Sequence, residues 1–145
     1  MSKIINVAEN GLYLVLEITV EKDVRLLHFG AAPLEREISE KKKAGFRLME
    51  LQLSGEDRDE YHGRTHRASY PGLRMTFDHY TDSTNELGRK LEINLIDNIT
   101  GLSAVQHFQF YNGIGILRSW TVLKNTGDSV LPVEYVSSFA LTGVD

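Results

Sequence analysis

Apolar and polar residues alternate along most of this chain, which is the pattern of β-strands that bury one face. The clearest alternation covers residues 12–19, where Leu12, Leu14, Leu16 and Ile18 occupy every second position. Turn signals separate the alternating stretches, and Asn112-Gly113 is the strongest of them. We expect strands at residues 4–7, 12–19, 24–29, 46–53, 73–78, 91–96, 105–111, 114–123 and 130–141.

This succession of short strands predicts an all-β fold, an antiparallel β-sandwich, because no stretch has the apolar periodicity of an amphipathic helix. Residues 12–29 are expected to form a hairpin, and the strands after Leu87 a meander of neighbouring hairpins. The length of 145 residues suits a single domain, residues 1–145.

Two stretches interrupt the alternation. Residues 35–44, EREISEKKKA, contain one large apolar residue, Ile38, and are expected to form an exposed linker without core contacts. A lysine-rich surface for a partner is the alternative for this stretch. Residues 54–66, SGEDRDEYHGRTH, concentrate ionisable groups that a β-sandwich does not need for folding. This polar loop is therefore either a solvated connection or part of a site.

The polar loop offers little chemistry of its own. His62 and His66 are separated by Gly63 in a loop, and no third ligand stands at a supporting spacing, so we expect no metal. A glycosidic acid–base pair needs two carboxyl groups held at a fixed separation, which one flexible acidic loop does not provide. We therefore expect no catalytic residues here, and a role in hydrogen bonding or charge complementarity.

Other residues of chemical interest lie inside expected strands. Trp120 is expected in the core, and Arg118, on the same face of its strand, is expected to pair with a carboxylate. His28 and His107 are expected to be structural histidines with satisfied hydrogen bonds. The chain has no GxSxG, P-loop, GxGxxG or HExxH motif.

Composition narrows the class of protein. A net charge of −4 argues against nucleic-acid binding, which requires clustered lysine and arginine. Cysteine is absent, which excludes disulfides and fits a reducing cytoplasm. The first residues lack the apolar region of a secretion signal, and no apolar run is long enough to span a membrane.

Three stretches, in order, resemble the N-terminal domain of α-galactosidases of glycoside hydrolase family 36. LLHFGAAP at 26–33 is similar to an early strand end of that family, and residues 54–69 are similar to a polar loop of one bacterial branch. Residues 91–141 carry its most recognisable block, with the patterns L-x-D-x-x-x-G-L, R-S-x-x-x-x-x-N-x-G and S-S-x-x-L.

The resemblance implies a β-supersandwich of the galactose-mutarotase-like type that precedes a catalytic (β/α)8 barrel, absent from these residues. It implies retaining hydrolysis of terminal α-galactosides by the complete enzyme, without metal or cofactor, and commonly as a homo-oligomer. This domain would serve as scaffold, as subunit contact and as part of the substrate pocket wall. The candidate contacts to substrate or to another subunit are Asp57, His62, Arg64 and His66.

Two other functions stay open at this point. A free-standing carbohydrate-binding β-sandwich would use exposed aromatic side chains, for which the candidates are Tyr61, Tyr70, Tyr80 and Tyr111. A mutarotase-like epimerase would need an acid and a base, for which the candidates are His62 or His107 and Glu56 or Glu134.

Overall fold

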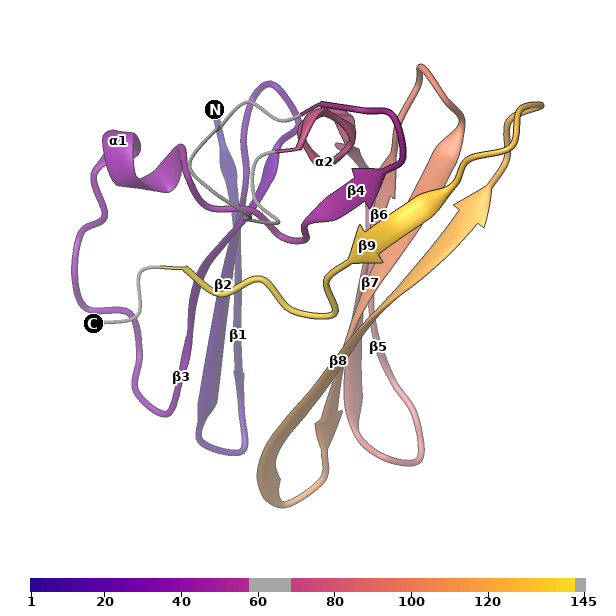
Figure 1. The fold of residues 1–145 in the computed structure, drawn as a ribbon. Coiled ribbons are helices and arrows are strands. Elements are labelled where there is room, and N and C mark those ends of the chain that lie inside the picture. Colours follow the sequence, from indigo (N-terminus) through magenta and orange to yellow (C-terminus); the bar gives the residue numbers. More distant parts are fainter. Residues whose placement is uncertain (58–68, 143–145) are drawn as a thin grey trace.

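The computed structural model describes residues 1–57 and 69–142, and it confirms the all-β antiparallel sandwich (Figure 1). The described strands form a three-stranded sheet in the order β1-β2-β3, a four-stranded sheet in the order β5-β6-β7-β8 and the small pair β4-β9. The elements are β1 Lys3–Glu9, β2 Leu12–Ile18, β3 Val24–Gly30, α1 Glu40–Lys43, β4 Leu51–Leu53, α2 Tyr70–Arg74, β5 Thr76–Thr84, β6 Arg89–Ile96, β7 Leu102–Tyr111, β8 Ile114–Asn125 and β9 Val133–Val136.

The three-stranded sheet grows from two hairpins. Asn10 and Gly11 join β1 to β2 with positive φ angles of 51° and 79°, the conformation of a tight hairpin turn that matches strand twist. The expected hairpin of residues 12–29 is confirmed, since β2 pairs antiparallel with β3. The alternation then places Leu14, Leu16 and Ile18 on the face toward the second layer, where they are buried.

The four-stranded sheet is the predicted meander, lengthened at its start. β6, β7 and β8 pair in sequence order, and the Asn112-Gly113 turn connects the last two. β5 covers Thr76–Thr84, whereas we expected a strand at residues 73–78, whose first two residues belong to α2. Residues 76–84 are too polar to show an apolar alternation, and their pairing with β6 makes them an edge strand nevertheless.

The two sheets stand face to face, as Figure 1 shows, and the core fills the space between them. Burying these side chains is the main source of folding free energy, at about 1.5–3 kcal/mol for each large apolar side chain. The largest buried apolar side chains are Leu14, Leu16, Leu26, Leu48, Leu51, Leu53, Leu91, Ile93, Leu102, Phe108 and Phe110.

The segments around β4 and β9 hold much less strand than predicted. Residues 46–53 were expected to form one strand, but only Leu51–Leu53 pair, with β9, at one end of the sandwich. The predicted strand at 130–141 likewise shrinks to Val133–Val136. Phe139 nevertheless packs edge-on against Phe29 and Phe108, so the chain after β9 closes the core without pairing.

The prediction that residues 35–44 have no core contact is wrong. Ile38 is only 8% exposed, and it packs with Val15, Leu27 and Phe46 in a second apolar cluster. The segment thus covers the outer face of the three-stranded sheet. One apolar residue among charged neighbours gives no periodic signal, which is why the sequence did not indicate this burial.

A buried polar network ties the chain after β9 to the four-stranded sheet. Gln106 on β7 is fully buried, and its amide nitrogen donates to Ser119 Oγ at 2.7 Å and to the Ser138 carbonyl at 2.8 Å. Thr121 donates to the Gln106 amide oxygen and to the Ser137 carbonyl, both at 2.7 Å. The network satisfies groups whose burial would otherwise be costly, so it fixes residues 137–138 across β7 and β8.

The part of the chain that the structure describes contains no helix long and apolar enough to cross a membrane.

Candidate functional site

The polar loop is closed at its base by a backbone hydrogen bond. Tyr70 donates its N–H to the carbonyl of Asp57 at 3.1 Å, which joins the two ends that the structure describes. Ser69 caps α2, since its hydroxyl accepts from the Gly72 N–H at 3.2 Å and donates to the Leu51 carbonyl. The ends of the loop are therefore anchored on β4 and α2.

Arg74 connects the start of this loop to the four-stranded sheet. Its guanidinium donates to both carboxylate oxygens of Glu56, at 2.7 and 2.9 Å, and lies 3.1 Å from Asp97 Oδ2. Asp97 is 1% exposed and also accepts from the N–H of Ile99 and the hydroxyl of Thr100. One cation thus holds the loop, α2 and the β6–β7 turn together.

The ionisation of this cluster follows from its contacts. The hydrogen bonds from Arg74 lower the pKa of Glu56 below its ordinary value of 4.5. Burial alone would raise the pKa of Asp97, but the hydrogen bonds from Ile99, Thr100 and Arg74 outweigh it and lower that pKa. Both carboxylates are therefore held in the charged form, and neither is suited to act as a proton donor.

Of the four predicted contact residues, the structure describes one. Asp57 is exposed at the end of the described loop segment. His62, Arg64 and His66 lie outside the described residues, so their convergence with Asp57 stays a prediction. Among the described residues, no group of three metal-ligating side chains comes together.

A second cluster, of aromatic and charged side chains, lies on the outer face of the four-stranded sheet. Trp120 on β8 stacks on its cross-strand partner His107 on β7, with ring centroids 4.7 Å apart and planes 3° from parallel. The Arg118 guanidinium lies 5.1 Å and the Lys90 ammonium 5.7 Å from the centre of the Trp120 ring. Glu92 pairs with Lys90 at 3.0 Å and approaches His107 Nδ1 to 3.1 Å.

This cluster corrects three expectations from the sequence. Trp120 is not in the core: its strand turns Leu117, Ser119, Thr121 and Leu123 inward and Trp120 outward. Arg118 forms no ion pair within the described residues and lies against the Trp120 ring instead. His107 Nδ1 is buried without a hydrogen-bond partner among the described residues, because the approach of Glu92 lacks the required geometry.

His28, by contrast, behaves as predicted. Its Nε2 lies 2.7 Å from the Ala32 carbonyl, so the ring has a hydrogen-bond partner close by in the chain.

The ionisation of His107 follows from its surroundings. Burial and the nearby charge of Lys90 lower its pKa below 6.5 in spite of Glu92, so the ring is neutral at pH 7.

The outer-face cluster combines a flat aromatic stack with charged donors and an acceptor. Such a surface can stack on a sugar ring and hydrogen-bond its hydroxyl groups. It does not contain either glutamate that was considered as the base of an epimerase. Glu56 is engaged by Arg74, Glu134 is exposed on β9, and neither is bonded to His107 within the described residues.

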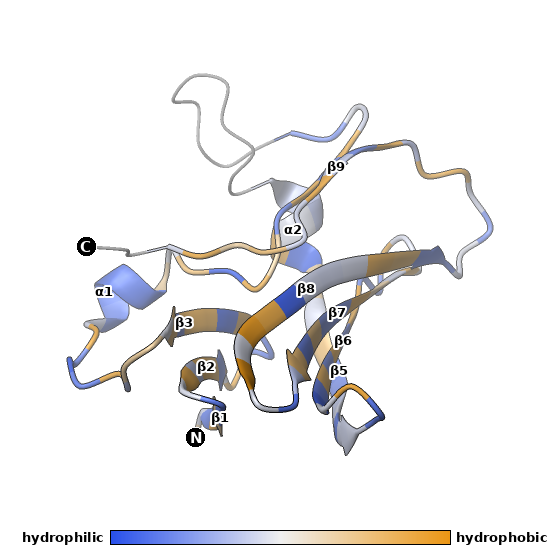
Figure 2. Cartoon of the chain, turned by 90° about the horizontal axis from the view of Figure 1, so that it is seen from below, coloured by the Kyte–Doolittle hydropathy of each residue, from blue (hydrophilic) through white to orange (hydrophobic). Residues whose placement is uncertain are grey.

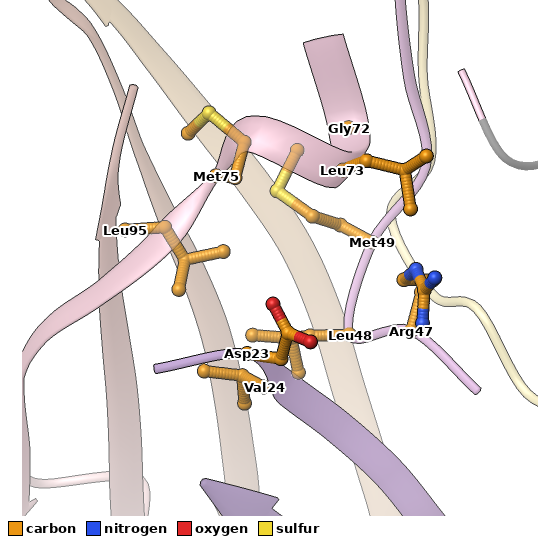
Figure 3. Close-up of a pocket in the computed structure, with 9 residues that line it drawn as sticks. All are labelled: Asp23, Val24, Arg47, Leu48, Met49, Gly72, Leu73, Met75 and Leu95. Atoms are coloured by element: carbon orange, nitrogen blue, oxygen red, sulfur yellow. The ribbon is translucent and has the colours of Figure 1, made fainter. Parts of the chain in front are cut away.

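Two further hollows lie away from these clusters. A cavity of about 20 Å³ lies between β3, the segment before β4 and α2. Figure 3 shows its lining, in which Asp23 and Arg47 stand beside apolar side chains such as Met49 and Met75. That volume holds a single water molecule. A groove of about 330 Å³ lies between the three-stranded sheet and the segment around Ile38, where apolar side chains such as Val15 and charged ones such as Lys43 both line it.

Comparison with known proteins gives a structural likeness and no sequence match. No protein-family model matches the chain, and no curated protein matches it. The crystal structure of the α-galactosidase from Lactobacillus brevis is similar, with a TM-score of 0.51 and 11% sequence identity over 83% of this chain. The chain spans about a fifth of that protein, since the match covers 21% of its length. The likeness shows the fold, and the fold is that of one part of a larger protein.

Replacing Arg74 by Met should lower the free energy of unfolding by about 2–3 kcal/mol, because the buried Asp97 carboxylate loses its cation. Urea denaturation at neutral pH measures this loss. Arg89→Met is the matched control: Arg89 also bridges two carboxylates, Asp82 and Glu9, but those are more exposed than Asp97, so its loss should stay below about 1 kcal/mol. Equal losses in the two variants would contradict the role of Arg74.

The same variant should change how stability depends on pH. Since the pKa values of Glu56 and Asp97 are lowered by folding, their contribution is complete above about pH 4.5 and is lost as the pH falls through the lowered values. Arg74→Met should therefore lose less stability than the parent between pH 5 and pH 2. A parallel pH profile for the two proteins would count against this account.

Proposed function

We propose that this chain is the N-terminal, non-catalytic sandwich domain of an α-galactosidase of glycoside hydrolase family 36, with the catalytic barrel outside these residues. The proposal rests on the fact that the resemblance in sequence and the likeness in fold fall on the same residues. Residues 91–141, which resemble the family most, include strands β6 to β9 of a fold that is similar to part of a known α-galactosidase.

The residues that carry the resemblance have architectural roles. Asp97 and Gly101 form the β6–β7 turn, where the Gly101 N–H donates to the Asp97 carbonyl at 2.8 Å. Asn125 accepts from the N–H of Gly127 at 3.0 Å in the turn after β8. A Cβ on Gly127 would lie 2.2 Å from the Thr100 carbonyl oxygen, so the two turns pack too closely for any side chain there. These roles support a scaffold function and require no catalytic residue in this chain.

The polar loop would then be the part of this domain that contacts the catalytic barrel. Its base is held by Arg74, and its charged residues would contact the barrel of the same subunit or of a neighbour. Asp57, His62, Arg64 and His66 are the proposed contacts. We further propose that the complete enzyme acts on α-galactosides, assembles as a homo-oligomer in the cytoplasm and needs no cofactor, nucleic acid or membrane.

The complete product of the gene should hydrolyse p-nitrophenyl α-galactoside, whereas residues 1–145 alone should not, because the catalytic groups lie outside them. A chromogenic assay of both purified proteins measures this. A reading frame that encodes no barrel after this domain, or hydrolysis by residues 1–145 alone, would contradict the proposal.

The outer-face cluster favours carbohydrate binding as a second candidate function. Trp120 joins the tyrosines considered first as a candidate, and of those Tyr70 is 41% exposed. Tyr61 lies outside the described residues, and the ring of Tyr80 packs on the core and carries the Lys3 ammonium at 4.5 Å.

Galactose should change the fluorescence of the parent protein with saturation in the millimolar range, since Trp120 is the only tryptophan. Glu92→Gln should weaken this binding because the charged acceptor beside the rings is lost, and Tyr70→Ala, on α2, should not. The measurement is a fluorescence titration with galactose. An unchanged spectrum up to about 10 mM sugar, which corresponds to under about 3 kcal/mol of binding, would exclude this function.

A further inference from the structure

β8 stands at one end of the four-stranded sheet. It is the longest strand, with 12 residues, and among the described strands it pairs with β7 alone. Its other side therefore presents a row of backbone N–H and C=O groups that no described strand satisfies. Such an edge is a ready template for pairing with another chain unless charge, proline or a bulge protects it.

The outer face of β8 carries more exposed apolar side chains than is usual for an edge strand. Ile116 is 53% and Val122 46% exposed, and Trp120 lies between them on the same face. Figure 2 shows two hydrophobic stretches on β8 separated by a polar one. The opposite edge strand, β5, carries the exposed residues Thr81 and Ser83 instead. The two edges of one sheet thus differ, and only β8 has the character of a contact surface.

The sequence of β8 is also complementary to itself. Ile116, Arg118, Trp120 and Val122 are arranged symmetrically about Ser119. A two-fold axis through Ser119, perpendicular to the sheet, would place Arg118 opposite Trp120 of the second copy and Ile116 opposite its Val122. The first pair is a cation–π contact and the second an apolar cross-strand pair, and symmetry makes each occur twice.

Arg118 is available for that contact. It forms no ion pair within the described residues, and its guanidinium already lies 5.1 Å from the Trp120 ring of its own chain. In the paired arrangement each guanidinium would lie beside two indole rings. The strand contains no carboxylate, and Lys124 falls opposite Ile114, so no like charges would meet directly across the axis.

We infer that β8 pairs antiparallel with β8 of a second copy of this chain, about a two-fold axis through Ser119, so that the two four-stranded sheets become continuous. The inference names a surface for the subunit contacts proposed above, but it rests only on the geometry and sequence of β8. An interface of one strand pair is small, so the dimer has modest affinity.

Sedimentation of residues 1–145 between about 1 and 200 µM should show a monomer–dimer equilibrium. Ile116→Lys and Val122→Glu should each weaken the dimer by about tenfold or more, because each puts a charge opposite an apolar residue in both symmetric pairs. An equimolar mixture of the two variants should regain the dimer, since the introduced lysine of one chain then faces the introduced glutamate of the other.

Thr81→Lys on β5 is the matched control and should leave the parent equilibrium unchanged, with circular dichroism showing that all variants keep the fold. A parent protein that stays monomeric over this range would overturn the inference. So would a dimer that Ile116→Lys does not weaken, or variants that fail to recombine. These outcomes test only the pairing of β8. The proposed α-galactosidase role is tested separately, by the activity of the complete gene product.

Discussion

The contact between Arg74 and Asp97 is the constraint on which the arrangement of the candidate site depends. A carboxylate that is 1% exposed needs compensation for its lost hydration, and here the N–H of Ile99, the hydroxyl of Thr100 and the guanidinium of Arg74 supply it. Because the same guanidinium binds Glu56, the compensation reaches the first residues of the polar loop. The loop is thereby attached to the β6–β7 turn, which joins the two central strands of the four-stranded sheet.

A second buried polar group, Gln106 on β7, fixes another irregular segment, the chain after β9. Gln106 replaces an apolar residue in the alternation of β7, and its amide binds the chain after β9. β9 ends at residue 136, and the segment after it is held by the backbone hydrogen bond from the Ser137 N–H to the Glu50 carbonyl, by side-chain hydrogen bonds and by Phe139. The sandwich therefore combines an apolar core, which supplies stability, with two buried polar clusters, which fix its irregular segments.

Much of the fold could be predicted from local patterns. Period-two alternation and the turns at Asn10-Gly11 and Asn112-Gly113 indicated the hairpins correctly. The pairing register of β7 and β8 could not be predicted from the turn. A two-residue turn alone would set His107 opposite Arg118, but the register shifts near Tyr111 and brings Trp120 there instead. The outer-face cluster, with Lys90 and Glu92 from β6, depends on that shift. Ile38 was missed because its burial depends on a sheet distant in sequence.

The role proposed for this sandwich is to present the polar loop to a catalytic domain. The most direct measurement is the activity and oligomeric state of the complete gene product carrying Asp57→Ala and Arg64→Ala, compared with Glu35→Ala and Arg36→Ala in the exposed segment before α1. The account predicts that the loop pair loses turnover, assembly or both, while the control pair keeps them. Unchanged turnover and assembly in the loop pair would reduce the loop to a solvated connection.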